Sequence, residues 1–402
     1  MHLSKEEKEI LEGAQGIAKQ KAMEILVALG NIYEAENLIP VTSVQVSGVS
    51  YKNLGDAGLE FLQDWAESGG RIQVPTTLNP AGMDLDQWRE LGFPENFAQK
   101  QLQVISCFRN FTIPPLCSCT PYLAGNLPLF GQHLAWAESS AVSFANSVLG
   151  ARSNREGGPS ALASAIIGKT ANYGLHLERN RKAQYLINVK CPLLNEADYG
   201  ALGYLTGKRV GAGIPYFRGI SVHPGLDYLK ALGAAMAASG AVALYHIENV
   251  TPEAKMYNML LDTHETIEIH NLAEGYESLN SSITDIDMVS LGCPHASWEE
   301  ICQIASFLEG KKVKTRLWIT TASTIASLAR RCGLEKKIQD AGAFLVSDTC
   351  MIVAPIQDLG IRSLATNSAK AACYAPSHCG VHVRYGNLTQ CLNAAIEGRF
   401  HS

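Results

Sequence analysis

The sequence lacks a long hydrophobic run. Its longest apolar stretch, residues 231–245, is short and is interrupted by Gly and Ser, whereas a membrane-spanning helix needs about 20 apolar residues. The first residues are charged and lack the apolar core of a signal peptide. We therefore expect a cytoplasmic protein with no membrane partner.

The sequence also lacks an excess of positive charge. It has 33 Lys and Arg residues against 38 Asp and Glu residues, for a net charge of −5, and no basic stripe. Nucleic acid is therefore not an expected partner. Hydrophobic residues make up 47% of the 402 positions, which excludes wholesale disorder and allows two or three domains or one large α/β unit.

The 11 cysteines are scattered and odd in number, so they do not indicate a disulfide framework. None of the usual zinc-ligand spacings is present, and neither is a Ser- or Cys-centred nucleophile elbow. A zinc- or cysteine-dependent hydrolase that uses His264, His270 or His378 is therefore a disfavoured alternative. Residues 163–170 resemble a phosphate loop only loosely, because their intervening residues are bulky and helical.

Strand patterns alternate with helix patterns along the whole chain. This alternation predicts an α/β fold with largely parallel sheets. It is most regular from residue 286 onward, where we expect strands at 287–291, 316–320, 344–347, 363–366 and 381–385 and helices at 298–308, 325–332 and 388–397. We expect N-terminal and middle α/β lobes in residues 1–285, with an internal boundary near 130–150, and a C-terminal α/β lobe in residues 286–402.

Three cysteines of the C-terminal third follow predicted strands. Cys293, Cys350 and Cys373 each come shortly after a strand, and the carboxyl ends of neighbouring parallel strands meet in one crevice. Three thiolates there could hold an iron–sulfur cluster and leave one iron open to substrate. Spacing alone favours the simpler alternative of three buried thiols.

A polar segment precedes the glycine break at residues 157–158. It contains Arg152, Asn154, Arg155 and Glu156. Guanidinium groups just before a helix N-terminus make a good anion site. Arg forms bidentate hydrogen bonds with carboxylate or phosphate, and the helix end offers free N–H groups. The alternative is a solvated loop, and the residues alone do not decide between the two.

Several longer blocks resemble the aconitase X family, and the resemblance spans nearly the whole chain. They are QVSGVS (45–50), GDAG (55–58), PTTLNP (75–80), CTPY (119–122), GNLP (125–128), WAESS (136–140) and NSVLGARSNREG (146–157). The resemblance implies an aconitase-like fold, with several parallel-sheet α/β lobes around a central cleft. It also implies that Glu138, Ser139 and Ser140 line the cleft together with the polar segment at 152–156.

The resemblance implies a hydro-lyase. One activity in the family is dehydration of (R)-5-phosphomevalonate to trans-anhydromevalonate 5-phosphate in the archaeal mevalonate route to isoprenoids, which we expect first; the other is dehydration of cis-3-hydroxy-L-proline. The resemblance places a 4Fe–4S cluster with one open iron on Cys293, Cys350 and Cys373. It assigns the general base to a separate small subunit, a swivelling domain that forms a heterodimer with this chain, so no base is named here. A non-catalytic scaffold subunit is disfavoured, because the cysteines and the arginines are present.

Overall fold

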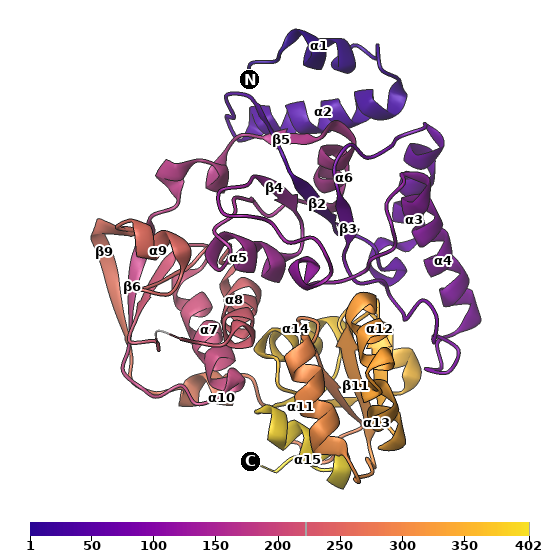
Figure 1. Cartoon of the computed structure of the whole chain (residues 1–402), viewed down its shortest axis with the longest axis vertical. Helices are drawn as coiled ribbons and strands as arrows, with labels where there is room; N and C mark the ends of the chain where they lie inside the picture. Colours follow the sequence, from indigo (N-terminus) through magenta and orange to yellow (C-terminus); the bar gives the residue numbers. More distant parts are fainter. Residues whose placement is uncertain (222, 402) are drawn as a thin grey trace.

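The computed structural model describes residues 1–221 and 223–401. Its strands form separate sheets that follow one another along the chain, and helices pack on them (Figure 1). The molecule is elongated, with the N-terminus at one end and the C-terminus near the other. None of the helices in these residues is long and apolar enough to cross a membrane.

The N-terminal sheet has three parallel strands in the order β3-β2-β4, and a short antiparallel pair, β1-β5, lies beside it. Apolar side chains from α2, α3, α4 and α6 form a core with this sheet. The elements are α1 (Lys5–Leu11), α2 (Ile17–Ile32), β1 (Leu38–Pro40), β2 (Ser43–Val46), α3 (Tyr51–Glu67), β3 (Thr76–Leu78), α4 (Glu95–Asn110), η1 (Pro121–Leu123), β4 (Leu134–Trp136), α5 (Ser139–Ser147), α6 (Gly158–Ile167) and β5 (Lys169–Ala171).

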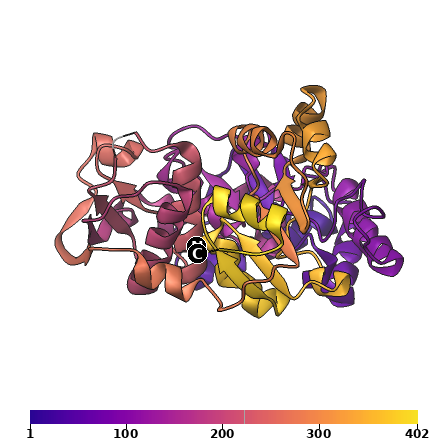
Figure 2. The same cartoon turned by 90° about the horizontal axis from the view of Figure 1, so that it is seen from below.

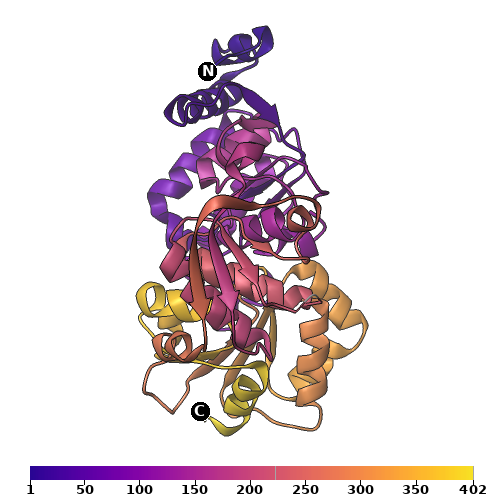
Figure 3. The ribbon, with the colours of Figure 1, turned by 90° about the vertical axis from the view of Figure 1, so that its left-hand side faces the viewer.

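The middle sheet has four parallel strands in the order β8-β7-β6-β9. Figure 3 shows this sheet from the side, with its helices behind it. The elements are η2 (Gly174–His176), η3 (Glu178–Asn180), β6 (Ala183–Val189), α7 (Glu196–Val210), β7 (Pro215–Arg218), α8 (Leu226–Gly240), β8 (His246–Ile247), α9 (Pro252–Met256), β9 (Leu260–Ile269) and α10 (Ala273–Ser278).

The C-terminal sheet has five parallel strands in the order β12-β11-β10-β13-β14, and a view from below shows its strands and helices beside the middle part of the chain (Figure 2). The elements are β10 (Met288–Leu291), α11 (Trp298–Leu308), β11 (Arg316–Thr321), α12 (Ser323–Arg331), α13 (Leu334–Asp340), β12 (Phe344–Ser347), η4 (Ile356–Leu359), β13 (Ser363–Thr366), α14 (Ala369–Cys379), β14 (His382–Tyr385) and α15 (Leu388–Glu397).

The predicted α/β class with parallel sheets is confirmed. The apolar pattern of residues 241–246 favours a strand, but of this segment only His246 pairs, as part of β8. Helix α8 ends at Gly240, Ala241 takes a left-handed conformation, and residues 242–245 make no strand pairing within the described part of the chain. The division into lobes near residue 286, with an internal boundary near 130–150, stays a prediction.

Helix α8 connects the three parts of the molecule. It packs against α5 of the N-terminal part, α7 of the middle part and α14 of the C-terminal part. Small residues allow this close approach: a Cβ at Gly203 of α7 would lie 2.5 Å from the carbonyl oxygen of Leu232. The loops at the carboxyl ends of β4, β10, β12 and β13 meet near this helix, and they carry the candidate site.

Candidate functional site

Three buried thiols from distant parts of the chain come together. Cys119 precedes η1, Cys293 follows β10, and Cys350 follows β12; their exposed fractions are 3%, 6% and 6%. The thiol of Cys293 donates a hydrogen bond to Cys350, and the charge of Cys350 acts on both other thiols. The backbone N–H of His295 donates to Cys119 Sγ at 3.1 Å. We call Cys119, Cys293 and Cys350 the thiol set.

A glycine places Cys293 in the thiol set. Gly292 ends β10 with a φ of +87°, and a Cβ at this position would lie 2.1 Å from the carbonyl oxygen of Thr320. Only glycine fits such a conformation and such a close approach. The chain therefore turns sharply at the carboxyl end of the strand and directs Cys293 toward Cys350.

The three thiols differ in acidity. The hydrogen bond from Cys293 lowers the pKa of Cys350 to about 7, with help from nearby backbone N–H groups and from Lys370. The pKa of Cys293 is raised because its thiol is the donor of that bond, and burial raises the pKa of Cys119 to about 12. Since metals bind thiolates, loading this set with iron must release protons.

A buried ion pair lies beside the thiol set. Lys370 in the first turn of α14 pairs with Glu138, the residue before α5, and donates a second hydrogen bond to Ser140 Oγ at 3.1 Å. Glu138 also accepts from Ser140 Oγ at 3.0 Å and from Asn79 Nδ2 at 2.9 Å. Burial alone would raise the pKa of Glu138, but Lys370 and the hydrogen bonds from Ser140 together outweigh burial and hold it below its usual value.

His295 is neutral and fully engaged. Its Nε2 donates to the carbonyl oxygen of Thr349 at 2.9 Å, so Nδ1 accepts from Ser118 Oγ at 3.0 Å. Burial lowers the pKa of His295 to about 4. Because Glu138 is held by Lys370 and both nitrogens of His295 are used, neither side chain is a free general base.

Three buried acceptor or hydroxyl atoms around the thiol set have no hydrogen-bond partner among the residues that the structure describes. They are Gln45 Oε1, Asn79 Oδ1 and Thr349 Oγ1. Gln45 donates to the Ser118 carbonyl, Asn79 donates to Glu138, and Thr349 accepts from His295, so all three residues belong to the same network. Buried polar atoms are normally satisfied, so these positions suit a ligand or ordered water.

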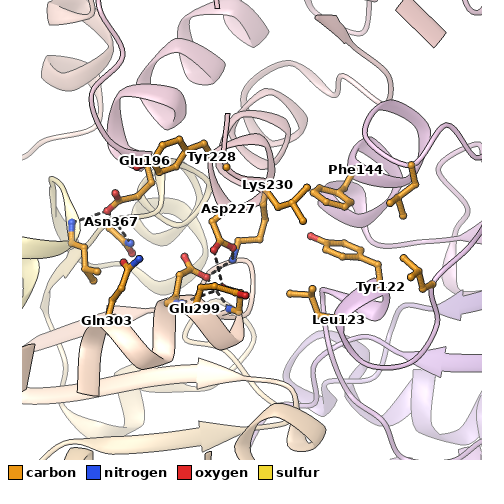
Figure 4. A pocket seen from close by; sticks show the side chains of 17 residues that line it. Tyr122, Leu123, Phe144, Glu196, Asp227, Tyr228, Lys230, Glu299, Gln303 and Asn367 are labelled. Atoms are coloured by element: carbon orange, nitrogen blue, oxygen red, sulfur yellow. Dashed lines mark hydrogen bonds and ion pairs between the residues drawn. The ribbon is translucent and has the colours of Figure 1, made fainter. Parts of the chain in front are cut away.

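A pocket of about 610 Å³ opens between η1, α5, α8 and α11 (Figure 4). Tyr122 and Phe144 stack on one side of it, with ring centroids 4.0 Å apart. Helix α8 contributes Asp227 and Lys230, and α11 contributes Glu299. The described lining residues are Tyr122, Leu123, Leu127, Phe144, Leu149, Glu196, Gly225, Leu226, Asp227, Tyr228, Lys230, Ser297, Glu299, Glu300, Gln303, Asn367 and Leu388.

A second, narrow recess lies beside this pocket, and Cys293 is among its lining residues. Asp227, Lys230 and Glu300 line both the pocket and the recess. Lys230 pairs with Asp227 at 2.9 Å and with Glu300, and it donates to the carbonyl oxygen of His295 at 3.3 Å. This contact links α8 to the loop that carries Cys293.

The residues expected to bind substrate separate into two groups. Glu138, Ser139 and Ser140 lie at the thiol set, and Ser139 Oγ is 3.5 Å from Glu138 Oε1. Arg155 is exposed, and its charge acts on Tyr374 of α14. The charge of Lys370 also acts on Tyr374. Arg155 is therefore on the same side of the molecule as the ion pair.

The other three residues expected to bind substrate in this segment make hydrogen bonds within the protein instead. Arg152 donates to the carbonyl oxygen of His176 at 3.2 Å and lies 4.0 Å from Glu178. Asn154 donates to the Tyr173 carbonyl and accepts from the Leu175 N–H. Glu156 is buried and accepts from the hydroxyls of Ser160 and Thr170.

Cys373 is not brought to the thiol set. It lies within α14, its Sγ is 3.9 Å from the carbonyl oxygen of Ala238 at the end of α8, and burial raises its pKa. Cys119 lies beside Cys293 and Cys350 instead. In the sequence, Cys119 was marked only by its place in the CTPY block (119–122). The rule that selected cysteines after predicted strands missed it, because no predicted strand precedes it. Spacing gave no signal at all for Lys370.

In residues 1–221 and 223–401, no group of three or more His, Cys, Asp or Glu side chains is arranged to hold a single metal ion. The thiol set still fits an iron–sulfur cluster by its chemistry. Thiolates are the usual cluster ligands, and each of them binds a different iron, so they need not converge on one point.

Three comparisons identify related proteins. Models of the first, second and third domains of aconitase X match residues 1–179, 183–277 and 286–397. A protein of Methanocaldococcus jannaschii named phosphomevalonate dehydratase large subunit is 52% identical, over 98% of this chain and 99% of the relative. A cis-3-hydroxy-L-proline dehydratase of Hypocrea jecorina is 35% identical, over 100% of this chain and 69% of the relative.

A solved structure agrees with these matches. The crystal structure of Thermococcus kodakaraensis aconitase X in its holo form superposes with a TM-score of 0.92 at 48% sequence identity, and the match covers 98% of this chain and 100% of that chain. The resemblance seen in the sequence blocks is thereby confirmed. The chain belongs to the aconitase X family.

Proposed function

We propose that this chain is the large subunit of a hydro-lyase that removes water from (R)-5-phosphomevalonate to give trans-anhydromevalonate 5-phosphate, a step of the archaeal mevalonate route. The observation that carries the proposal is the convergence of Cys119, Cys293 and Cys350 beside a buried lysine. Relatives that are 52% identical over nearly their full length bear the name phosphomevalonate dehydratase large subunit. Relatives named for cis-3-hydroxy-L-proline are 35% identical, so this amino acid is the second candidate substrate.

The thiol set is proposed to hold the iron–sulfur cofactor. When bound, a cluster with an open iron supplies a Lewis acid that weakens the bond between carbon and the departing hydroxyl. Lys370 supports the thiolate forms, since its positive charge opposes the rise in the pKa of Cys119 and Cys293 and helps to lower that of Cys350. Cys373 remains the alternative third ligand inferred from the sequence, but its Sγ faces Ala238 of α8.

The remaining residues position the substrate. Water leaves when a base removes the proton next to the carboxylate and hydroxide departs from the neighbouring carbon. Arg155 is an exposed cation that suits the carboxylate or the phosphate of the substrate, whereas Lys370 is already paired with Glu138 and acts on the thiols. Gln45, Asn79 and Thr349 offer unpartnered oxygens to its hydroxyl groups.

The general base is proposed to come from a small subunit, which forms a heterodimer or higher assembly with this chain. The charged side chains that act on the thiols, Lys370 and Glu138, are paired with each other, and His295 is engaged at both nitrogens. The name "large subunit" of the relatives agrees with a second chain.

The test is turnover by the anaerobically purified complex of this chain with its small subunit. We expect conversion of 5-phosphomevalonate to a product that has lost one water, detected by mass spectrometry, and little conversion of cis-3-hydroxy-L-proline. Preference for the amino acid would select the second candidate, and turnover of neither would contradict the hydro-lyase assignment.

A further inference from the structure

The pocket of about 610 Å³ has the wrong charge for an anionic substrate. Its described lining includes four carboxylates, Glu196, Asp227, Glu299 and Glu300, against one cation, Lys230. Lys230 is already shared between Asp227 and Glu300, and it also donates to the His295 carbonyl. A molecule with a carboxylate and a phosphate would be repelled here, because like charges close together in a partly buried site raise each other's energy.

The opposite wall and the rim of the pocket are apolar. Tyr122, Phe144 and Leu149 form the wall, while Leu127 and Leu226 stand at the rim with exposed fractions of 62% and 64%. The surface continues along the loop after Leu127 to Leu129 and Phe130, which are 68% and 47% exposed. Contiguous exposed apolar residues around a hollow are typical of a protein–protein contact.

The pocket also shares lining residues with a recess at the thiol set. The recess that it shares through Asp227, Lys230 and Glu300 is lined by Cys293. Of the acid–base side chains beside the thiols, Glu138 and His295 are both engaged within the described part of this chain, so neither of them is a free base. A partner that occupies the pocket therefore contacts residues that also line the recess at Cys293, and so lies beside the proposed centre.

From these observations we propose that the pocket between α8, α11 and the 122–127 loop receives a segment of the small subunit that combines an apolar side chain with a lysine or arginine. The inference rests on the proposed function, since it requires a small subunit. The apolar side chain packs on Tyr122, Phe144 and Leu226. The cation lies near Glu299 and near Asp227 and Glu300, the two carboxylates that pair with Lys230. The anionic substrate binds elsewhere, beside Arg155 and Lys370.

The test is the affinity of the small subunit for variants of the full chain, measured by calorimetry. Glu299→Lys reverses an exposed charge in the first turn of α11, and Leu226→Asp places a charge on the apolar rim. We expect each to weaken binding at least about tenfold, and Glu299→Gln to weaken it less. Binding to the unchanged chain should also weaken as salt rises, because salt screens charge pairs.

A matched control is available in α1. Glu6 is exposed and takes the same position after a serine N-cap, in a capping box, as Glu299 does in α11. Glu6→Lys therefore imposes the same helix-end penalty far from the pocket, and we expect unchanged binding. Circular dichroism and thermal melting of every variant verify that the chain is folded.

Small-subunit affinities that are equal for Glu299→Lys, Leu226→Asp and the unchanged chain would overturn the inference, while turnover by the native complex would leave the proposed function standing. A lower KM for 5-phosphomevalonate in Glu299→Lys, with small-subunit affinity unchanged, would overturn it too, because the pocket would then hold the substrate. If the unchanged chain binds no small subunit and the mixture has no dehydratase activity, the proposed function fails together with the inference.

Discussion

Lys370 and Glu138, 232 positions apart in the chain, form a buried ion pair beside Cys119 and Cys293. The pair joins the first turn of α14 to the start of α5, and thus the C-terminal part of the molecule to the N-terminal part. The thiol set depends on the same junction, since Cys119 comes from one side of it and Cys293 and Cys350 come from the other.

Removing the cation of this pair should destabilise the chain strongly. Lys370→Met leaves the carboxylate of Glu138 buried and uncompensated, which costs about 3–5 kcal/mol. Replacing both residues, as in Lys370→Met with Glu138→Leu, should recover most of the loss. Urea unfolding measures the free energy of unfolding of both variants.

The control for that experiment is Lys336→Met. Lys336 forms an exposed pair with Asp340 on α13, and such pairs contribute about 0.5 kcal/mol or less. Equal losses in Lys370→Met and Lys336→Met would contradict the structural importance of the buried pair.

The two arginines of the 152–156 segment should differ in their effect on catalysis. Arg155 is exposed and its charge acts on Tyr374, whereas Arg152 is held by the His176 carbonyl and Glu178. We expect Arg155→Ala to raise KM for the anionic substrate by about tenfold, the loss of one charge-assisted contact. Arg152→Ala should leave KM close to its normal value. Steady-state kinetics of the complex checks both, and the reverse order would place the anion site at Arg152.

Stability should fall in mild acid because of a buried histidine. Burial lowers the pKa of His246 to about 4 from 6.5, and its Nε2 contacts the carbonyl oxygen of Arg181. Below pH 6.5 the unfolded chain binds a proton that the folded chain excludes until about pH 4, so stability is lost as the pH falls through this range. Between pH 7.5 and 5 the loss from this group is about 2 kcal/mol.

His246→Gln should flatten that part of the pH profile, since glutamine can still donate to the Arg181 carbonyl but does not titrate. His382→Gln is the matched control, because His382 is exposed. Urea unfolding at several pH values measures the slopes. A profile for His246→Gln as steep as that of the unchanged chain would show that His246 is not the cause.

The sequence predicted the C-terminal sheet closely. The helix expected at 298–308 is α11, and the strands expected at 344–347 and 363–366 are β12 and β13. These strands are buried apolar runs, and the helix begins with a capping box at Ser297, so local signals are strong there. In contrast β9 was not predicted, because it lies at the edge of the middle sheet and most of its residues are exposed or half-buried polar groups.

The site was predicted less completely, and the reason is helical geometry. Cys373 follows β13 in the sequence, but α14 already begins at Ala369, and each residue of a helix turns roughly 100° from the last. Lys370 and Tyr374, four residues apart, therefore share a face toward the ion pair, while Cys373 faces α8. Cys119 joins the set only through tertiary packing, for which a strand-based rule has no signal.

The central claim is that Cys119, Cys293 and Cys350 hold an iron–sulfur cluster. Iron and acid-labile sulfide per chain, measured after oxygen-free purification of the unchanged chain and four alanine variants, test it most directly. We predict near-stoichiometric iron and sulfide in the unchanged chain and in Cys373→Ala, and loss of both in Cys119→Ala, Cys293→Ala and Cys350→Ala while the chains stay folded. Loss of the cluster in Cys373→Ala with retention in Cys119→Ala, or no iron in the unchanged chain after reconstitution, would contradict the account.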